Sequence, residues 1–405
     1  MARVIRAKVK PTILVWARES AGYSLAAAAK RLSIPEEKLT AWEIGEAAPT
    51  ISQLQGMAAA YKRPLSAFYL QERPKSFMVM RDFRRLPGSG LRVISPELTL
   101  EIRIAQQRRE LAMELMEETD GKLPRFRLSA RLEESAEAVG ERIRRALKIT
   151  ASEQREWSKD RQGYAAFNAW RERIEHLGVL VFQATRVSTE EISGFAIAEL
   201  VLPVIVITQS DTPPVRRTFG LLHEFVHLML RLSGVSDLDV DATRPPEDQK
   251  VEVFCNRAAA AALMPRDQLL TEELVMQNSS GGSSWTDVVI GELARRYSVS
   301  REAIVRRLLT FDLVTKAFYQ KKRSQYVEEF RQRKHVEKER AKAAGKMFFT
   351  NPPRDAMTQI GRPLVQMILD SYYRDRLSLS DVSGHLGIRT RHIPRLEDLV
   401  SAQEW

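Results

Sequence analysis

Two histidines and a glutamate are the residues whose types and spacing most directly indicate chemistry. His223 and His227 stand four residues apart, with Glu224 between them, inside the apolar stretch 219–230. On a helix, residues i and i+4 share a face, so the two imidazoles can bind one metal ion. Glu224 could then act as general base on a water at that metal. The five residues alone leave one alternative open, a buried helix with two hydrogen-bonded histidines.

A third metal ligand has to come from elsewhere, because a catalytic zinc site has three protein ligands and one water. The sequence predicts a helix over 251–264 that ends at Pro265 and carries Glu252 near its start. Its alanine run allows close packing on the histidine helix, which would bring Glu252 to the metal. Glu247 is a competitor, but it lies in a predicted loop rich in proline and acidic residues. Such a ligand set suits Zn²⁺, and also Mn²⁺ or another divalent ion.

A small β-sheet is predicted directly before the histidine helix. Three apolar runs, at 179–183, 192–199 and 203–207, have the length and composition of buried strands. They follow a predicted helix over 167–175. Residues 216–218 are expected to cap the start of the histidine helix.

The rest of the chain is predicted to be helical, so the expected fold class is mainly α with a small β-sheet (α+β). A long helix from 96 to about 118 and another over 135–147 are expected to connect the outer modules. After Pro265 come a helical pair at 285–309, a charged helix over 316–346 and a small helical module over 361–399.

The first seventy residues are predicted to form an all-α helix-turn-helix module. Short helices are expected over 12–21, 25–32 and 35–43, with Gly22 ending the first and Ser24 capping the second. In such modules the third helix enters the major groove of DNA.

Candidate DNA contacts are polar residues of these helices and their turns: Lys30, Arg31, Lys38, Thr40 and Thr50. The third helix begins with Glu36 and Glu37, whose carboxylates oppose phosphates, although glutamate can accept from a cytosine amino group. A module that recognises a protein partner or its own dimer mate therefore stays the alternative to DNA binding.

Composition and charge set the wider limits. At 405 residues the chain is expected to form two to four domains. The formal charge of +11 favours nucleic acid or another acidic partner. Residues 1–75 hold twelve Lys/Arg against six Asp/Glu, and residues 316–346 hold eleven against four. No apolar run approaches the roughly 20 residues of a membrane span. The absence of a secretion signal and the single cysteine, Cys255, are typical of a cytoplasmic protein.

Two parts of the chain resemble known families. Residues 24–54 are similar to the XRE type of helix-turn-helix in the following residues: Ser24-Leu25, Ala28-Ala29, Leu32, Ile34, Leu39, Trp42-Glu43-x-Gly45, Pro49-Thr50 and Leu54. Roughly residues 160–315 resemble the ImmA/IrrE metallopeptidases in several motifs that occur in order: Gly178-Val179-Leu180-Val181, Gly194-Phe195-Ala196, Pro203-Val204-Ile205-Val206, Arg217-x-Phe219, His223-Glu224-x-x-His227-Leu228, and Glu252-x-x-x-Asn256-x-x-Ala259 followed by Leu263-Met264-Pro265.

The second resemblance implies a zincin-like domain that works as a zinc-dependent metalloendopeptidase. In that family the two histidines and the downstream glutamate bind the metal, and the glutamate between the histidines is the base. Carried over, this makes His223, His227 and Glu252 ligands and Glu224 the base. Family members can relieve repression by cleaving a repressor or antitoxin, so such a protein is the expected substrate.

The expected domains are a helix-turn-helix over 1–74, a helical linker region over 75–160, the metallopeptidase domain over 161–318, and the charged helix with the C-terminal module over 319–405. DNA and a protein substrate are the expected partners, with a homodimer also considered and no membrane. The alternative function is a DNA-binding transcription regulator whose metal site is sensory or structural.

Overall fold

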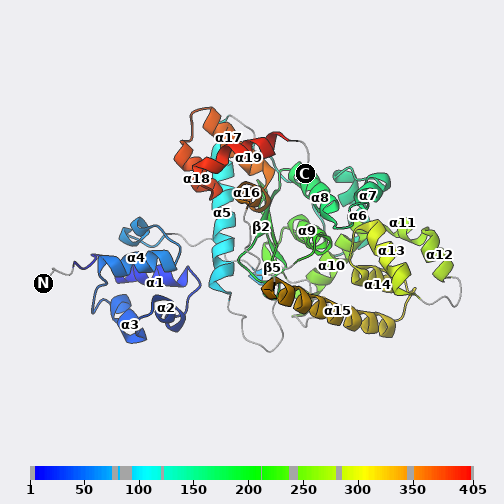
Figure 1. The fold of residues 1–405 in the computed structure, drawn as a ribbon, viewed down its shortest axis with the longest axis horizontal. Coiled ribbons are helices and arrows are strands. Elements are labelled where there is room, and N and C mark those ends of the chain that lie inside the picture. The colour runs from blue at the N-terminus through cyan, green and yellow to red at the C-terminus, as the bar shows by residue number, and fades with distance from the viewer. Residues whose placement is uncertain are drawn as a thin grey trace. The chain divides into compact units, whose positions relative to one another are not determined.

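The computed structural model describes residues 5–74, 81–82, 94–119, 123–210, 212–236, 245–279, 285–343 and 351–402. The chain divides into two compact units, coloured along the chain in Figure 1. The first comprises Met1–Met80 and Ser89–Gln107, and the second comprises Arg81–Gly88 and Arg108–Trp405.

The first unit contains the helix-turn-helix. Its helices are α1 (Pro11–Glu19), α2 (Leu25–Leu32), α3 (Glu36–Ile44) and α4 (Ile51–Ala60), followed by the short 3₁₀ helix η1 (Leu65–Tyr69). The Ser24 hydroxyl accepts from the Ala27 amide at the start of α2, and Thr50 forms a capping box with Gln53 at the start of α4. The predicted helices are present, and their ends differ by one or two residues.

The core of this module is a cluster of apolar side chains from all of its helices, including Leu14, Leu39, Trp42, Leu54 and Phe68. The first half of the long helix α5 (Pro96–Glu117) belongs to the same unit.

The second unit is built on a five-stranded sheet with the strand order β1-β5-β3-β4-β2. Its strands are β1 (Arg81–Asp82), β2 (Leu180–Ala184), β3 (Gly194–Ile197), β4 (Val204–Thr208) and β5 (Gly234–Ser236). Strand β3 runs antiparallel to both of its neighbours, whereas β2 is parallel to β4 and β1 is parallel to β5. The three predicted strands are present, and β1 and β5 are additional. Strand β3 is therefore interior to the sheet.

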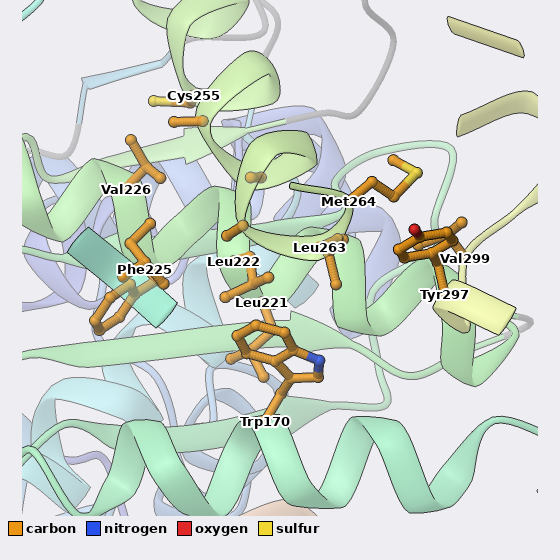
Figure 2. Packing of buried hydrophobic residues seen from close by; sticks show 14 of the residues in the cluster. Trp170, Leu221, Leu222, Phe225, Val226, Cys255, Leu263, Met264, Tyr297 and Val299 are labelled. Carbon is orange, nitrogen blue, oxygen red and sulfur yellow. The ribbon is translucent and has the colours of Figure 1, made fainter. Parts of the chain in front are cut away.

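Five helices pack either on this sheet or on the helices that cover it. They are α6 (Ala136–Ala146), α7 (Ala151–Trp157), α8 (Tyr164–Glu175), α9 (Pro214–Met229) and α10 (Pro246–Leu263). Helix α9 packs against β3 and β4, and α10 packs against both α9 and α6 (Figure 1). Figure 2 shows the apolar layer that these elements share, with Trp170 of α8 facing Leu221 and Leu222 of α9.

Helices also form the remainder of the second unit. They are α11 (Arg266–Leu270), α12 (Glu273–Ser279), α13 (Asp287–Tyr297), α14 (Arg301–Thr310), α15 (Lys316–Ala343), α16 (Pro352–Ile360), α17 (Arg362–Tyr373), α18 (Leu379–Leu386), the 3₁₀ turn η2 (Thr390–His392) and α19 (Ile393–Ser401). Helix α16 lies against β2, and both Arg171 and Gln183 donate to the carbonyl of Thr358. Among the described residues, no helix combines the length and apolarity that a membrane crossing requires.

Candidate metal centre

Helix α9 carries the two histidines and is buried along most of its length. It begins at Pro214, in keeping with the preference for proline in the first helical turn. The expectation that residues 216–218 cap its start was wrong, because Arg217 already lies inside the helix. The guanidinium of Arg217 is buried and donates to the Gln183 side chain at 3.1 Å and to the Thr212 carbonyl at 2.9 Å.

Three residues bring their candidate ligand atoms together between α9 and α10. The Nε2 atoms of His223 and His227 are 3.1 Å apart, and His227 Nε2 lies 3.1 Å from Glu252 Oε1. Glu252 Oε2 is 3.4 Å from His223 Nε2. Ligands about 2.0–2.1 Å from a tetrahedral ion are about 3.3 Å from one another, so the spacing of these atoms fits a single ion.

Helix α10 starts earlier than the sequence predicted, at Pro246, which places Glu252 in its second turn. Glu247 consequently lies in the first turn of the helix rather than in a loop. Its side chain is exposed, and it is not part of the buried His223, His227 and Glu252 group. Alanines of α10 contact α9 and α6, and this close packing brings Glu252 to the histidines.

Asn256 holds the ring of His223. The Nδ1 atom of His223 lies 3.1 Å from Asn256 Oδ1, and both side chains are buried. The amide oxygen can only accept, so Nδ1 carries the proton and Nε2 keeps its lone pair for a metal. No separate role was predicted for Asn256 from the sequence. Its position four residues after Glu252, on the same face of α10, is the signal that could have identified it.

Glu224 lies beside this group with its carboxylate buried. Neither of its oxygens accepts a hydrogen bond of normal geometry from a described residue. Burial raises the pKa of Glu224 to about 8, with the Glu252 carboxylate adding to the rise and His223 opposing it. The Ser236 side chain is the one hydrogen-bonding group that lowers this pKa, and a buried carboxyl with so little hydrogen bonding is costly in a site that is only structural. It fits a site in which a water and a metal ion complete the group.

Strands β3 and β5 approach the same group closely. The Ser236 hydroxyl of β5 lies 3.3 Å from His227 Nε2. A Cβ on Gly194 of β3 would come within 3.2 Å of the Glu224 side chain and 2.6 Å of the Val206 carbonyl. Gly194 therefore gives Glu224 the room that it occupies.

The charges of the three candidate ligands depend on one another. Burial lowers the pKa of His223, but the Glu252 carboxylate outweighs it and the pKa ends above the usual value. For His227, burial prevails and lowers the pKa. Burial alone would raise the pKa of Glu252, yet the two imidazoles hold that pKa well below its usual range. The result is a carboxylate beside nitrogen donors, a combination that favours a divalent cation.

A groove of about 1360 Å³ lies next to this site, although His223, Glu224, His227 and Glu252 do not line it. Its walls come from α9, α10, α14 and α15, and Asn256 lies in its lining. Four exposed cations of the lining, Arg216, Arg257, Lys316 and Arg331, make no ion pair with a described residue. The groove therefore presents positive charge beside the metal site.

The five candidate DNA contacts of the first unit are three exposed cations and two threonines whose hydroxyls already form hydrogen bonds. Lys30, Arg31 and Lys38 are exposed, and the Lys38 ammonium lies over the Trp42 ring. Two hydroxyls are already engaged, since Thr40 donates to the carbonyl of Glu36 and Thr50 caps α4.

Comparison with known families agrees with both halves of this architecture. Residues 14–68 match the model of the helix-turn-helix family, and residues 174–309 match the model described as the IrrE N-terminal-like domain. No curated protein matches the chain. The two matches support the predicted architecture, an N-terminal helix-turn-helix of the XRE type, a class that binds DNA, followed by an ImmA/IrrE-like peptidase domain.

Proposed function

We propose that this protein is a metal-dependent endopeptidase of gene regulation that cleaves a repressor or an antitoxin-like protein. Its N-terminal module would bind DNA. The observation that carries the proposal is the meeting of His223, His227 and Glu252 within 3.1–3.4 Å, beside the buried carboxyl of Glu224.

The donor set assigns a part to each residue. His223, His227 and Glu252 would hold the ion, and Asn256 would orient His223. When bound, a divalent ion such as Zn²⁺ supplies Lewis acidity at the scissile carbonyl. Glu224 would take the proton of the attacking water and return it to the leaving amine. A bound divalent ion would lower the pKa of Glu224 from its metal-free value of about 8, and so favour the carboxylate that accepts the proton.

Access to the site is part of the proposal. His223, Glu224, His227 and Glu252 are each at most 1% exposed. A peptide could reach them only if the surrounding chain moved aside, and the groove that ends at Asn256 is the route we propose. Its exposed arginines and lysine favour a substrate segment with acidic residues.

The same burial also favours the competing function, a DNA-binding regulator whose metal is sensory or structural. A closed site is typical of structural metal ions, whereas catalytic sites keep a position open to solvent. The two functions differ in what they require of Glu224, which is not a ligand in either.

The deciding experiment compares wild-type protein with Glu224→Gln, each loaded with Zn²⁺ or Mn²⁺. Cleavage would be read by mass spectrometry on the product of the adjacent gene and on a peptide library. We expect the variant to keep its metal and to lose at least about a hundredfold in rate, since it lacks the general base. Equal cleavage by both proteins, or none by wild type with retained metal, would favour the regulator.

A further inference from the structure

The three helices at the C-terminal end repeat the spacing of the N-terminal helix-turn-helix. In both, a five-residue connection, 20–24 or 374–378, leads to an eight-residue helix, α2 or α18. That helix begins after a capping serine, Ser24 or Ser378, and ends at a left-handed residue, Ser33 with φ 55° or Gly387 with φ 64°. The offset is constant, because 378 − 24 and 387 − 33 are both 354.

The apolar positions follow the same offset. Val382, Leu386, Ile388, Ile393 and Leu396 are all buried in the C-terminal module. Their counterparts in the first unit are Ala28, Leu32, Ile34, Leu39 and Trp42. Ala28, Leu39 and Trp42 belong to its buried apolar cluster, and Leu32 and Ile34 pack against that cluster. The shared spacing of cap, turn and apolar positions indicates that α18 and α19 are arranged like α2 and α3.

The turn alone does not make a DNA-reading surface, as α13 and α14 show. They are also joined through a left-handed serine, Ser298 with φ 51°. Helix α15 covers α14, however, and the basic residues of α14 are occupied. Arg301 pairs with Glu329, Arg306 donates to the Tyr319 hydroxyl, and Arg307 makes two hydrogen bonds to Glu137.

The corresponding surface of the C-terminal module is exposed and basic. Arg389 precedes η2, Arg391 lies in η2, and Arg395 lies in the first turn of α19. All three are exposed and none makes an ion pair with a described residue, although Arg391 donates a hydrogen bond to the His392 ring. At the matching positions the first unit has Pro35, Glu37 and Ala41. The acidic residues of α19, Glu397 and Asp398, come after these arginines, and Glu397 accepts from the Tyr373 hydroxyl.

We propose that residues 362–401 form a second DNA-binding helix-turn-helix, with Arg389, Arg391 and Arg395 contacting the phosphate backbone of duplex DNA. The matched spacing gives η2 and α19 the place that α3 has in the first unit, which is the recognition helix of a helix-turn-helix. Its three arginines favour phosphates more than the two glutamates that begin α3. This inference does not depend on the peptidase activity.

The test uses the full chain and a fluorescent duplex of mixed sequence about three helical turns long. Binding is measured by anisotropy between about 50 and 200 mM salt. The triple variant Arg389→Ser, Arg391→Ser and Arg395→Ser should reduce the slope of log affinity against log salt by about 2–3, since each lost phosphate contact contributes about 0.9. Hydrogen exchange of amides 388–396 should slow when DNA is added to wild type.

A matched triple, Arg127→Ser, Arg145→Ser and Arg161→Ser, removes the same charge from exposed arginines without ion pairs elsewhere in the second unit. It should leave the slope within about one unit of wild type. An equal loss in both triples would reduce the effect to net charge and overturn the proposal. An unchanged slope in the 389/391/395 triple would also overturn it, and altered self-association in that triple would then assign the surface to a protein partner.

Discussion

At the scale of single residues, the candidate metal centre is a set of side chains whose charges are set by one another. The Glu252 carboxylate raises the pKa of His223. The hydrogen bond to Asn256 fixes which ring nitrogen of His223 faces the candidate metal position. Removing a group that acts through a ligand should therefore weaken metal binding without abolishing it.

Asn256→Ala tests this role. We expect the affinity for Zn²⁺ to fall by about 10–100-fold, because His223 loses the acceptor that fixes its tautomer. Competition with a chromophoric chelator measures the change. Asn278→Ala is the control, since its amide only donates to the Leu274 carbonyl on α12. Unchanged affinity in Asn256→Ala would show that the hydrogen bond to His223 has no part in metal binding.

Acidification should release the metal. A protonated imidazole cannot coordinate, and the pKa of His223 in the metal-free protein lies above its usual 6.5 because of Glu252. Affinity is therefore expected to be highest above that raised pKa and to fall steadily as the pH drops through it. Chelator competition over about pH 8 to 5.5 would follow the change, and a constant affinity over this range would contradict the arrangement.

At the scale of elements, close packing of helices brings the ligands together. A Cβ on Gly140 of α6 would lie 2.6–2.7 Å from Ala261 and the Ala262 amide of α10. Helix α10 cannot retreat without moving Glu252, which is its seventh residue. The absence of a side chain at Gly140 therefore allows α10 to lie where it places the candidate ligand Glu252 beside the histidines.

Gly140→Ala is expected to lower the free energy of unfolding by about 1–3 kcal/mol, although alanine is the better helix former. Gly291→Ala in α13 provides the matched control. It has no atom within 4 Å of its added Cβ, so it should raise stability by about 0.5–1 kcal/mol. Urea unfolding of both variants measures the two effects. If Gly140→Ala were also stabilising, α6 and α10 would not be in contact as described.

Much of this element structure could be predicted from the sequence, for definite physical reasons. Capping residues and positive-φ turns gave α2 and α3 within a residue, and the apolar run of α9 gave its two histidines a shared face.

The early start of α10 was missed because Pro245 and Pro246 resemble a loop, although proline is favoured in the first turn of a helix. Strands β1 and β5 are two and three residues long, too short for a pattern of alternation. The position of Asn256 depends on the contact of α9 with α10, which sequence spacing alone does not contain.

At the scale of the whole molecule, the candidate ligands all belong to the second unit. Metal binding should therefore stabilise that unit and leave the helix-turn-helix unit unchanged. Free Zn²⁺ at a hundred times its dissociation constant contributes about 2.7 kcal/mol to the unit that binds it.

Differential scanning calorimetry with and without a chelator tests this expectation. The transition of the second unit should move to lower temperature when metal is removed, while the melting of the first unit stays in place. His223→Ala/His227→Ala protein should show no shift on chelation. A shift of equal size in that double variant would indicate that the metal binds elsewhere.

The strand β1 has a consequence for how such a protein can be divided or recombined. The chain leaves the first unit, contributes Arg81 and Asp82 to the sheet beside β5, and then returns to the first unit as the beginning of α5. Strand β5 in turn carries Ser236, which contacts His227. A cut at residue 108 would keep every candidate ligand and still remove the neighbour of β5. The helix-turn-helix unit and the unit with the candidate metal site are therefore interleaved along the chain, and exchanging one of them between relatives would require three crossovers, after residues 80, 88 and 107, rather than one.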